Sequence, residues 1–277
     1  MTHFQPNAGQ AKAITAPLES HVCIIAGAGT GKTETLSRRY VRILRETPGI
    51  HPRNIVVLTF TEKAATEMRA RIMYAVRDEQ LPFSRLDMAE ANISTFHSFA
   101  ARLALKKSIV LDLDQNAPFC DEQIASDVTN TCWELFLAHG WEKAFAHAQA
   151  EVINSVNWDE DKYGALMTKL IDDVQGLALN GAQLAERVAH TNTFDDMFNA
   201  LGDALLWNFV QRTTLLQERG QLDLDDIINI VPQLVAHEPT LREEIKFIMV
   251  DEYQDTSAAQ AQMLQAVTPH QQHKHSH

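Results

Sequence analysis

A glycine-rich loop between an apolar run and an amphipathic stretch constrains this chain more than any other feature. The loop reads Ala26-Gly27-Ala28-Gly29-Thr30-Gly31-Lys32-Thr33 and follows an apolar run at residues 22–25. It matches the pattern of a phosphate-binding loop, with Ala26 where the strict pattern has glycine. An apolar strand before the loop and a helix after it form the context that this pattern requires. The segment therefore predicts an α/β fold with a phosphate site.

Each residue type in the loop has a physical role. The glycines permit backbone conformations closed to other residues, so successive N–H groups can surround phosphate oxygens at the N-terminus of a helix. Lys32 is expected to neutralise the β- and γ-phosphates, and the Thr33 hydroxyl to bind Mg²⁺. Residues 26–33 are therefore the predicted nucleotide-binding loop, although a merely structural glycine turn is the alternative.

Two adjacent carboxylates end a second apolar run far along the chain. Residues 245–250 have the length of a buried strand, and Asp251 and Glu252 follow directly. In an open α/β sheet, ligands bind beyond the carboxyl ends of the strands, where these side chains are expected. One carboxylate there can hold Mg²⁺, and the other can accept the proton of an attacking water. Capping of the next helix is the alternative, and residues 255–257 suit that role.

The loop and the carboxylates together predict an ATP site. We expect Lys32, Glu252 and Gln254 to be catalytic, and Thr33 and Asp251 to hold the metal. The expected ligands are ATP and Mg²⁺.

Length and composition limit the classes of protein to consider. The chain has 277 residues, of which 45% are hydrophobic, so it can bury one or two cores. No segment is apolar over the length needed to cross a membrane. Cys23, Cys120 and Cys132 are odd in number and show no CxxC spacing, so we expect reduced thiols in the cytoplasm. Cys23 is expected to be a small buried side chain of the first strand.

Charge is distributed unevenly along the chain. The net charge is −12, with +6 in residues 1–110 and −18 in residues 111–277. Contacts to a phosphate backbone are therefore expected in the first part. The candidate cations there are Arg38, Arg39, Lys63, Arg69, Arg71, Lys106 and Lys107, with solvated helix faces as the alternative.

Apolar patterning divides the chain into segments. Strands at residues 22–25, 55–60 and 93–96 alternate with helices at 32–46, 62–78 and from 96 through Lys107, which predicts a mostly parallel sheet covered by helices. The helix at 62–78 should bury Ala65, Met68, Ile72 and Val76. We expect a P-loop core at 1–107 and 221–267, an all-helical insert at 108–220 and a disordered His-rich tail at 268–277. A metal site in that tail is the alternative to disorder.

The motifs, in their order and spacing, resemble those of the UvrD/Rep-type superfamily 1 DNA helicases. The resemblance runs from Phe4 to Gln260 and includes the phosphate loop and the acidic motif. It implies a RecA-like domain with an inserted helical subdomain. Asn7 and Gln10 match the N-terminal glutamine motif of the family, whose amide reads the adenine edge. Residues 222–228 are similar to the aspartate-rich segment that leads back to the core.

Two further motifs resemble those that contact single-stranded DNA in the family. They are Leu58-Thr59-Phe60-Thr61-Glu62-Lys63 and Ile93-Ser94-Thr95-Phe96-His97. The expected DNA-binding residues are Thr59, Phe60, Thr61, Lys63, Thr95 and His97. Hydroxyl and imidazole groups at strand ends can bind phosphates, and an exposed aromatic can stack on any base.

The family's later motifs have no counterpart after Gln260. We therefore expect the ATP-binding core of a 3′-to-5′ DNA helicase that binds Mg-ATP but lacks the groups for efficient hydrolysis and unwinding on its own. Single-stranded DNA, and a polypeptide that supplies the second motor domain, are the expected partners. A non-enzymatic nucleotide- or DNA-binding module is the alternative. An unrelated phosphate-loop kinase or transporter ATPase is disfavoured, because it leaves the two DNA-facing motifs unexplained.

Overall fold

The computed structural model describes residues 4–27, 29–106, 122–138, 160–190, 196–219, 221 and 224–268. The described residues within 4–99, 235–256 and 264–268 form one compact unit, here called the sheet unit. Those within 100–234 and 257–263 form the second, here called the helical unit. Ala28, Cys120, Lys107 and the His-rich tail from residue 269 lie outside the described residues. The domain boundaries expected from sequence stay predictions.

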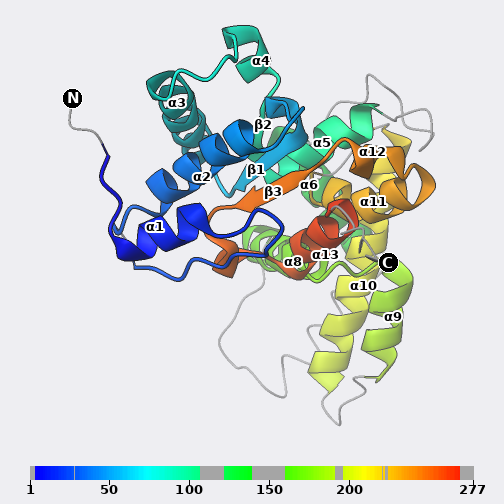
Figure 1. Cartoon of the computed structure of the whole chain (residues 1–277). Coiled ribbons are helices and arrows are strands. Elements are labelled where there is room, and N and C mark those ends of the chain that lie inside the picture. The colour runs from blue at the N-terminus through cyan, green and yellow to red at the C-terminus, as the bar shows by residue number, and fades with distance from the viewer. Residues whose placement is uncertain are drawn as a thin grey trace, which may run out of the picture. The chain divides into compact units, whose positions relative to one another are not determined.

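Three parallel strands form the sheet, in the order β2-β1-β3. They are β1 (Ile55–Thr59), β2 (Asn92–Thr95) and β3 (Phe247–Val250), as Figure 1 shows. All five residues of the central strand β1 are buried, as expected for an apolar, β-branched strand with neighbours on both sides. The predicted parallel sheet flanked by helices is confirmed.

Helices pack around this sheet in contact with one another. They are α1 (Ala8–Thr15), α2 (Lys32–Glu46), α3 (Glu62–Asp78) and α4 (Arg85–Ala89). Helix α2 contacts both α1 and α3, and α3 also contacts β1 and β2 (Figure 1). The bounds of α2 and α3 are those that the sequence predicts. The four positions expected on the buried face of α3, namely Ala65, Met68, Ile72 and Val76, are all buried.

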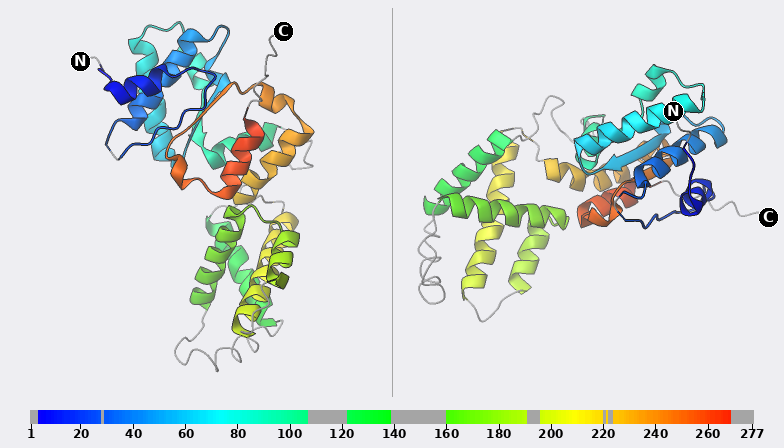
Figure 2. Two further views of the ribbon diagram at one scale, coloured as in Figure 1. Left: turned by 60° about the horizontal axis from the view of Figure 1, so that its bottom comes forward. Right: turned by 90° about the vertical axis from the view of Figure 1, so that its left-hand side faces the viewer.

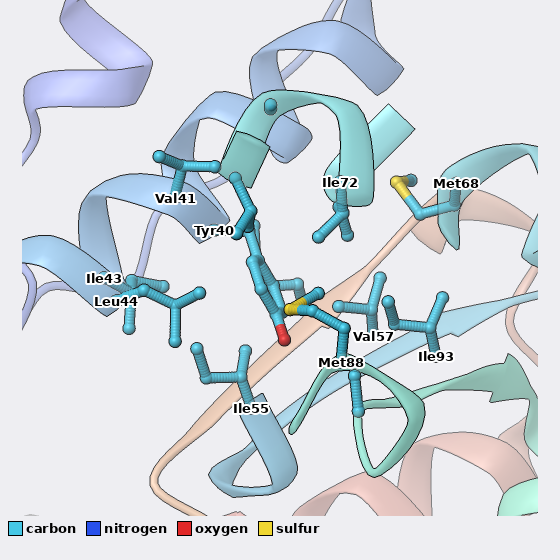
Figure 3. Close-up of a cluster of buried hydrophobic side chains, with 14 of the residues drawn as sticks. Tyr40, Val41, Ile43, Leu44, Ile55, Val57, Met68, Ile72, Met88 and Ile93 are labelled. Carbon is cyan, nitrogen blue, oxygen red and sulfur yellow. The ribbon is translucent and has the colours of Figure 1, made fainter. Parts of the chain in front are cut away.

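The core of the sheet unit lies among α2, α3 and the strands. Tyr40 of α2 is fully buried in one cluster with Ile72 of α3, Val57 of β1 and Met88 of α4 (Figure 3). Its hydroxyl donates a hydrogen bond to the Pro52 carbonyl at 3.4 Å. Burial raises the pKa of this phenol. A buried aromatic side chain contributes a large apolar area to the packing of α2, together with the buried Val41, Ile43 and Leu44 of the same helix.

The segment before the phosphate loop differs from its prediction. Residues 22–25 belong to no strand, Val22 and Cys23 are exposed, and Ile25 is 95% exposed. The predicted first strand and the predicted burial of Cys23 are therefore wrong. An apolar run signals strand propensity only, whereas a strand also requires a partner for its backbone N–H and C=O groups. β3 pairs with β1, and no other described segment pairs with β3.

The helical unit contains α6 (Glu122–Ala138), α8 (Glu160–Gly176), α9 (Gly181–His190) and α10 (Asp196–Glu218). Helix α6 packs against α8 and α10, and α9 packs against α10; these are the green to yellow helices of Figure 2. Buried residues such as Phe136, Met167 and Phe209 form separate small clusters between them. The predicted helical insert is confirmed where it is described.

Shorter and connecting elements complete the chain. They are the 3₁₀ turns η1 (Pro52–Asn54) and η2 (Tyr253–Asp255) and the helices α5 (Phe96–Lys106), α11 (Leu224–His237), α12 (Thr240–Glu243) and α13 (Ala258–Val267). Ser257 precedes α13, and its hydroxyl accepts a hydrogen bond from the Gln260 N–H, so the expected cap of this helix is present. In the described part of the chain, no helix is long and apolar enough to span a membrane.

Candidate nucleotide site

The glycine loop leads directly into the N-terminus of α2. Gly29 and Gly31 adopt φ values of 74° and 84°, which side chains with a Cβ atom disfavour. The Thr30 hydroxyl donates to the Gly27 carbonyl at 2.7 Å, which closes the loop on itself. The Thr35 N–H donates to the Gly31 carbonyl at 3.0 Å, whereas the N–H groups that precede it in α2 have no carbonyl partner within the helix, and the helix dipole favours an anion there. The described part of the loop therefore shows the positive φ values and the helix N-terminus that are typical of a phosphate-binding loop.

The loop lysine meets the acidic motif at this point. Lys32 Nζ lies 2.9 Å from Glu252 Oε2, and Gln254 Nε2 donates to the same oxygen at 2.6 Å. Lys32 begins α2, whereas Glu252 follows β3 by two residues and has a left-handed backbone, with φ 52°. The fold thus brings together the three residues that the sequence predicts to be catalytic.

The pKa values of Asp251 and Glu252 are shifted in opposite directions although the two residues are adjacent. The Asp251 N–H donates to the Leu58 carbonyl at 2.9 Å, so the ladder between β3 and β1 continues to this residue. Burial, and then the charge of Glu252, raise the pKa of Asp251. The hydrogen bond from Gln254, and then that from Lys32, lower the pKa of Glu252. The lowered pKa favours the ionised form of Glu252, which is the form that can accept a proton. A cation bound near Asp251 would offset the free energy cost of ionising that carboxylate.

The oxygen atoms of Thr33, Asp251 and Glu252 are of the chemical type that a divalent cation binds. Asp251 and Glu252 offer carboxylates, and the Thr33 hydroxyl has no hydrogen-bond partner among the described residues. Hard oxygen ligands of this kind suit Mg²⁺, which commonly binds one or two carboxylates plus phosphate oxygens and waters. The described residues contain no group of three or more His, Cys, Asp or Glu side chains placed to hold a metal by themselves. A metal here would therefore need nucleotide oxygens as further ligands.

Gln10 approaches the loop from α1. Its Nε2 donates to the Thr30 carbonyl at 2.9 Å, and its Oε1 accepts from the Asn7 N–H at 2.9 Å. The Gln10 N–H in turn donates to Asn7 Oδ1, which completes a capping box at the start of α1. The motif that the sequence assigns to adenine thus also contacts the phosphate loop, a contact that no local sequence signal reveals.

The residues predicted to bind DNA lie where β1 and β2 end. Thr59 and Thr95 are register partners on adjacent strands. Thr59 is 1% exposed, and its hydroxyl donates to the Thr61 carbonyl at 3.1 Å. Thr61 is exposed, and its hydroxyl accepts from the Ala64 N–H as the cap of α3. Lys63 is exposed in the first turn of that helix.

The other members of this group are more enclosed. The Thr95 hydroxyl donates to Glu62 Oε1 at 2.9 Å, and that carboxylate oxygen also accepts from Ser98 at 2.7 Å. Phe60 is partly buried, and its ring lies 5.3 Å from that of Phe96, centroid to centroid. His97 is half-buried in the first turn of α5. The sequence did not predict Glu62 as the shared acceptor in this cluster.

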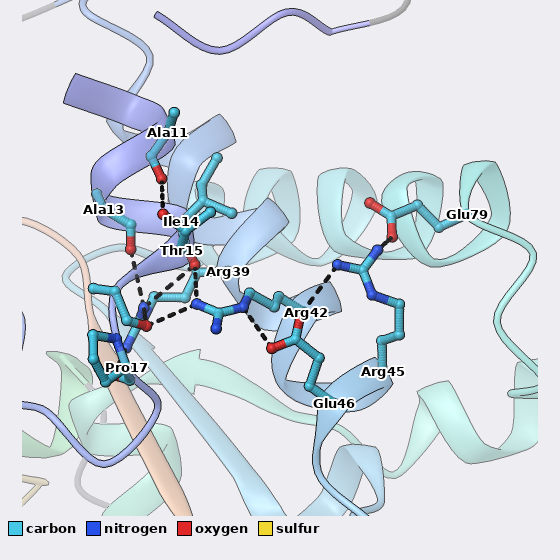
Figure 4. A network of polar contacts seen from close by, with 11 residues as sticks. Ala11, Ala13, Ile14, Thr15, Pro17, Arg39, Arg42, Arg45, Glu46 and Glu79 are labelled. Carbon is cyan, nitrogen blue, oxygen red and sulfur yellow. Dashed lines mark hydrogen bonds and ion pairs between the residues drawn. The ribbon is translucent and has the colours of Figure 1, made fainter. Parts of the chain in front are cut away.

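Several cations expected to contact a phosphate backbone are used within the fold instead. Arg39 is 7% exposed, and its guanidinium donates to the carbonyls of residues 13, 14, 16 and 17 (Figure 4). Arg38 pairs with Glu34 and Asp78, and Arg69 donates to the Ile93 carbonyl at 2.7 Å. The expected exposure of Arg39 is wrong, because its charge is satisfied by the last carbonyls of α1.

Arg42 also caps α1. It donates to the Ile14 and Ala16 carbonyls at 2.8 and 2.7 Å and pairs with Glu46 (Figure 4). Arg39 and Arg42 lie three residues apart on one face of α2, and that spacing is the only sequence signal of the shared contact. Arg71 lies 3.9 Å from Glu34, and Lys106 and Lys107 have no described side chain.

A comparison with protein families matches residues 6–274 to the UvrD/REP helicase N-terminal domain. The chain belongs to the UvrD/REP helicase family. The parallel sheet flanked by helices is consistent with the RecA-like domain that this membership implies, as the sequence motifs predicted.

Similar UvrD/REP proteins have names that describe ATP-dependent action on DNA. The chain is 29% identical over 247 residues to the ATP-dependent DNA helicase SRS2 of Saccharomyces cerevisiae, covering 87% of this chain and 19% of that protein. It is 28% identical over 260 residues to the ATP-dependent DNA helicase PcrA of Staphylococcus epidermidis, covering 92% of this chain and 30% of that protein. The chain thus spans less than a third of the length of either relative.

Proposed function

We propose that this chain is the ATP-binding core of an ATP-dependent DNA helicase or translocase that couples hydrolysis to 3′-to-5′ movement on single-stranded DNA. The observation that supports the proposal best is the ion pair of Lys32 with Glu252 at 2.9 Å, at the mouth of the glycine loop. A lysine at the phosphates and a carboxylate base within reach of the same point are the two charged groups that phosphoryl transfer to water needs.

Each group at the site has a defined task in this proposal. The N–H groups of the loop and Lys32 bind the phosphates, and Gln10, which contacts the loop at Thr30, reads the adenine edge. Glu252 accepts the proton of the attacking water, and Gln254 orients that carboxylate through its hydrogen bond. Thr33 and Asp251 hold Mg²⁺, which, when bound, neutralises charge on the phosphate oxygens. The ionised state of Glu252 fits the role of a base.

Single-stranded DNA is the proposed polymer substrate. Thr61 and Lys63 are exposed at the N-terminus of α3, where hydroxyl, ammonium and helix-dipole contacts to a phosphate can combine. The other proposed DNA-binding residues, Thr59, Phe60, Thr95 and His97, lie near the same strand ends. A polypeptide that carries the second motor domain is the proposed protein partner. We expect transition-state groups supplied by such a domain to accelerate hydrolysis about 10³- to 10⁵-fold.

Nucleotide binding is the most direct test. Mg-ATP at about 100 times its dissociation constant should raise the free energy of unfolding by about 2.7 kcal/mol, measured by thermal or urea unfolding. The Lys32→Ala variant should show little of this stabilisation, whereas Lys12→Ala, which removes an exposed lysine of α1, should keep it. Equal stabilisation of Lys32→Ala and the wild type would contradict the proposed site.

A further inference from the structure

We propose that Gln10 is a positioning residue for the phosphate loop, because its side-chain amide fixes the orientation of the peptide plane between Thr30 and Gly31. This inference rests on the proposed nucleotide binding and adds to it a role that is independent of the base. It makes the start of α1 part of the phosphate site.

The contact itself is specific and well anchored. Gln10 Nε2 donates to the Thr30 carbonyl at 2.9 Å across 20 residues of sequence. The other end of the same amide, Oε1, is held by the Asn7 N–H, and the Gln10 N–H is held by Asn7 Oδ1. An amide fixed at both ends has little rotamer freedom left to lose, so its bond to Thr30 costs little further entropy.

The peptide plane explains why this bond matters for a phosphate. In a trans peptide the C=O of Thr30 and the N–H of Gly31 point in opposite directions. A donor that holds the carbonyl therefore also fixes the direction of the Gly31 N–H. In a phosphate loop the N–H groups bind the anion. If the plane reversed, the carbonyl oxygen would replace that N–H group and repel the phosphate.

Gly31 makes such a reversal easy in the absence of a partner. It has φ 84°, and a glycine has no Cβ to restrict rotation of its neighbouring peptide planes. A Cβ atom built at this position would lie 2.7 Å from Gln10 Nε2, so the amide of Gln10 occupies the space of the absent side chain. Gly31 and Gln10 thus have complementary roles. Gly31 lets the backbone adopt this conformation, and the Gln10 amide fills the space beside it and fixes the peptide plane between Thr30 and Gly31.

Helix α1 provides a rigid base for this contact. Arg39 and Arg42 of α2 bind the carbonyls at the C-terminal end of α1, and the capping box closes its N-terminal end. The eight-residue helix buries no side chain of its own, so these polar contacts hold it in place. Gln10 is therefore attached to the same helix, α2, whose N-terminus receives the phosphates.

A ligand without a base separates this role from base recognition. We would measure the affinities of Mg-ATP and of Mg-tripolyphosphate by isothermal titration calorimetry, for the wild type, Gln10→Ala and Gln10→Met. Loss of one hydrogen bond should weaken both ligands about fivefold in both variants. A residue that reads only the adenine edge would weaken ATP and leave tripolyphosphate unchanged, and that result would overturn the inference.

Asn7→Ala is the matched control. It removes the acceptor of the Gln10 N–H and weakens the cap of α1, while Gln10 Nε2 keeps its bond to Thr30. We expect its tripolyphosphate affinity to stay within about twofold of the wild type. If Asn7→Ala weakens tripolyphosphate as much as Gln10→Ala does, the effect comes from the stability of α1 and the inference is wrong. A wild type that binds neither ligand would instead overturn the proposed function, on which this inference rests.

Discussion

Lys32 Nζ and Glu252 Oε2 lie 2.9 Å apart, although 220 residues separate them in the sequence. The two groups neutralise each other at the point where the phosphates of a nucleotide are proposed to bind. A nucleotide must therefore compete with Glu252 for the lysine.

Glu252→Gln should increase affinity for ADP while it removes hydrolysis. In this variant, Lys32 has no ion pair that must be broken before its ammonium binds the phosphates. The carboxylate is 41% exposed, and exposed ion pairs contribute about 0–1 kcal/mol, so we expect a gain of no more than about fivefold. Calorimetric titration measures this gain. Glu243→Gln, which removes the same charge from exposed α12, should leave the affinity unchanged.

Asp251→Asn should raise the free energy of unfolding at pH 7. Burial and Glu252 raise the pKa of Asp251 in the folded state, so the folded protein binds the proton more tightly than the unfolded chain. Ionisation of Asp251 therefore lowers the free energy of unfolding. This loss begins as the pH rises through the ordinary value of 3.8 and is complete above the pKa of the folded state. Urea unfolding between pH 7 and pH 4 should show the advantage of the variant over the wild type shrinking as the pH falls. A less stable variant at pH 7 would contradict this explanation.

Glu252 should contribute to the pH dependence with the opposite sign. Hydrogen bonds from Gln254 and Lys32 lower its pKa in the folded state, so its stabilisation is present above the ordinary value of 4.5 and is lost as the pH falls through the folded pKa. Comparing Glu252→Gln with the wild type over the same pH series measures this loss. A difference that grows toward acid pH would be inconsistent with the ion pair.

Arg39→Ala should destabilise the sheet unit by about 3 kcal/mol, because several carbonyls in the last turn of α1 and just after it lose a charged donor. Urea unfolding followed by circular dichroism measures the change, and hydrogen exchange should become faster in α1. Arg53→Ala, which removes an exposed arginine 3.6 Å from Glu90, should cost less than about 1 kcal/mol. Equal effects of the two variants would show that Arg39 does not hold α1.

Cys23 should react with a thiol reagent much faster than Cys132. Cys23 is exposed, whereas burial raises the pKa of Cys132 from 9.0 to about 11, which alone reduces its thiolate fraction about 100-fold. The measurement uses a Cys120→Ser background and mass spectrometry of the labelled peptides. Protection of Cys23 without nucleotide would indicate that residues 22–25 are paired as a strand after all.

Lys63→Ala should weaken binding of single-stranded DNA regardless of its sequence. Removing one phosphate contact should reduce the slope of log affinity against log salt by about 0.7. Fluorescence anisotropy with a labelled oligonucleotide at several salt concentrations measures this slope. Lys12→Ala serves as the control, since its exposed lysine lies in α1 and has no proposed contact to DNA. An unchanged slope for Lys63→Ala would remove this residue from the proposed DNA site.

Local patterns predicted much of the sheet unit. The bounds of α2 and α3, the parallel order of strand and helix units, and the buried face of α3 all follow from the spacing of apolar residues, which neighbours along the chain determine. The loop and the acidic motif were recognisable for the same reason. Their residue types are each required by the chemistry of phosphate and metal binding, so the pattern is visible without coordinates.

Contacts between distant segments decided the rest. Residues 22–25 have the composition of a strand, yet a strand exists only where another backbone satisfies its hydrogen bonds. The sequence suggests that Arg39 is an exposed cation, but its guanidinium is buried because it donates hydrogen bonds to carbonyls at the end of α1. The sequence by itself thus determined the local elements and the chemistry of the two motifs. Only the tertiary structure placed Lys32 against Glu252 and Gln10 against Thr30, because those contacts join residues 220 and 20 positions apart and no local pattern encodes them.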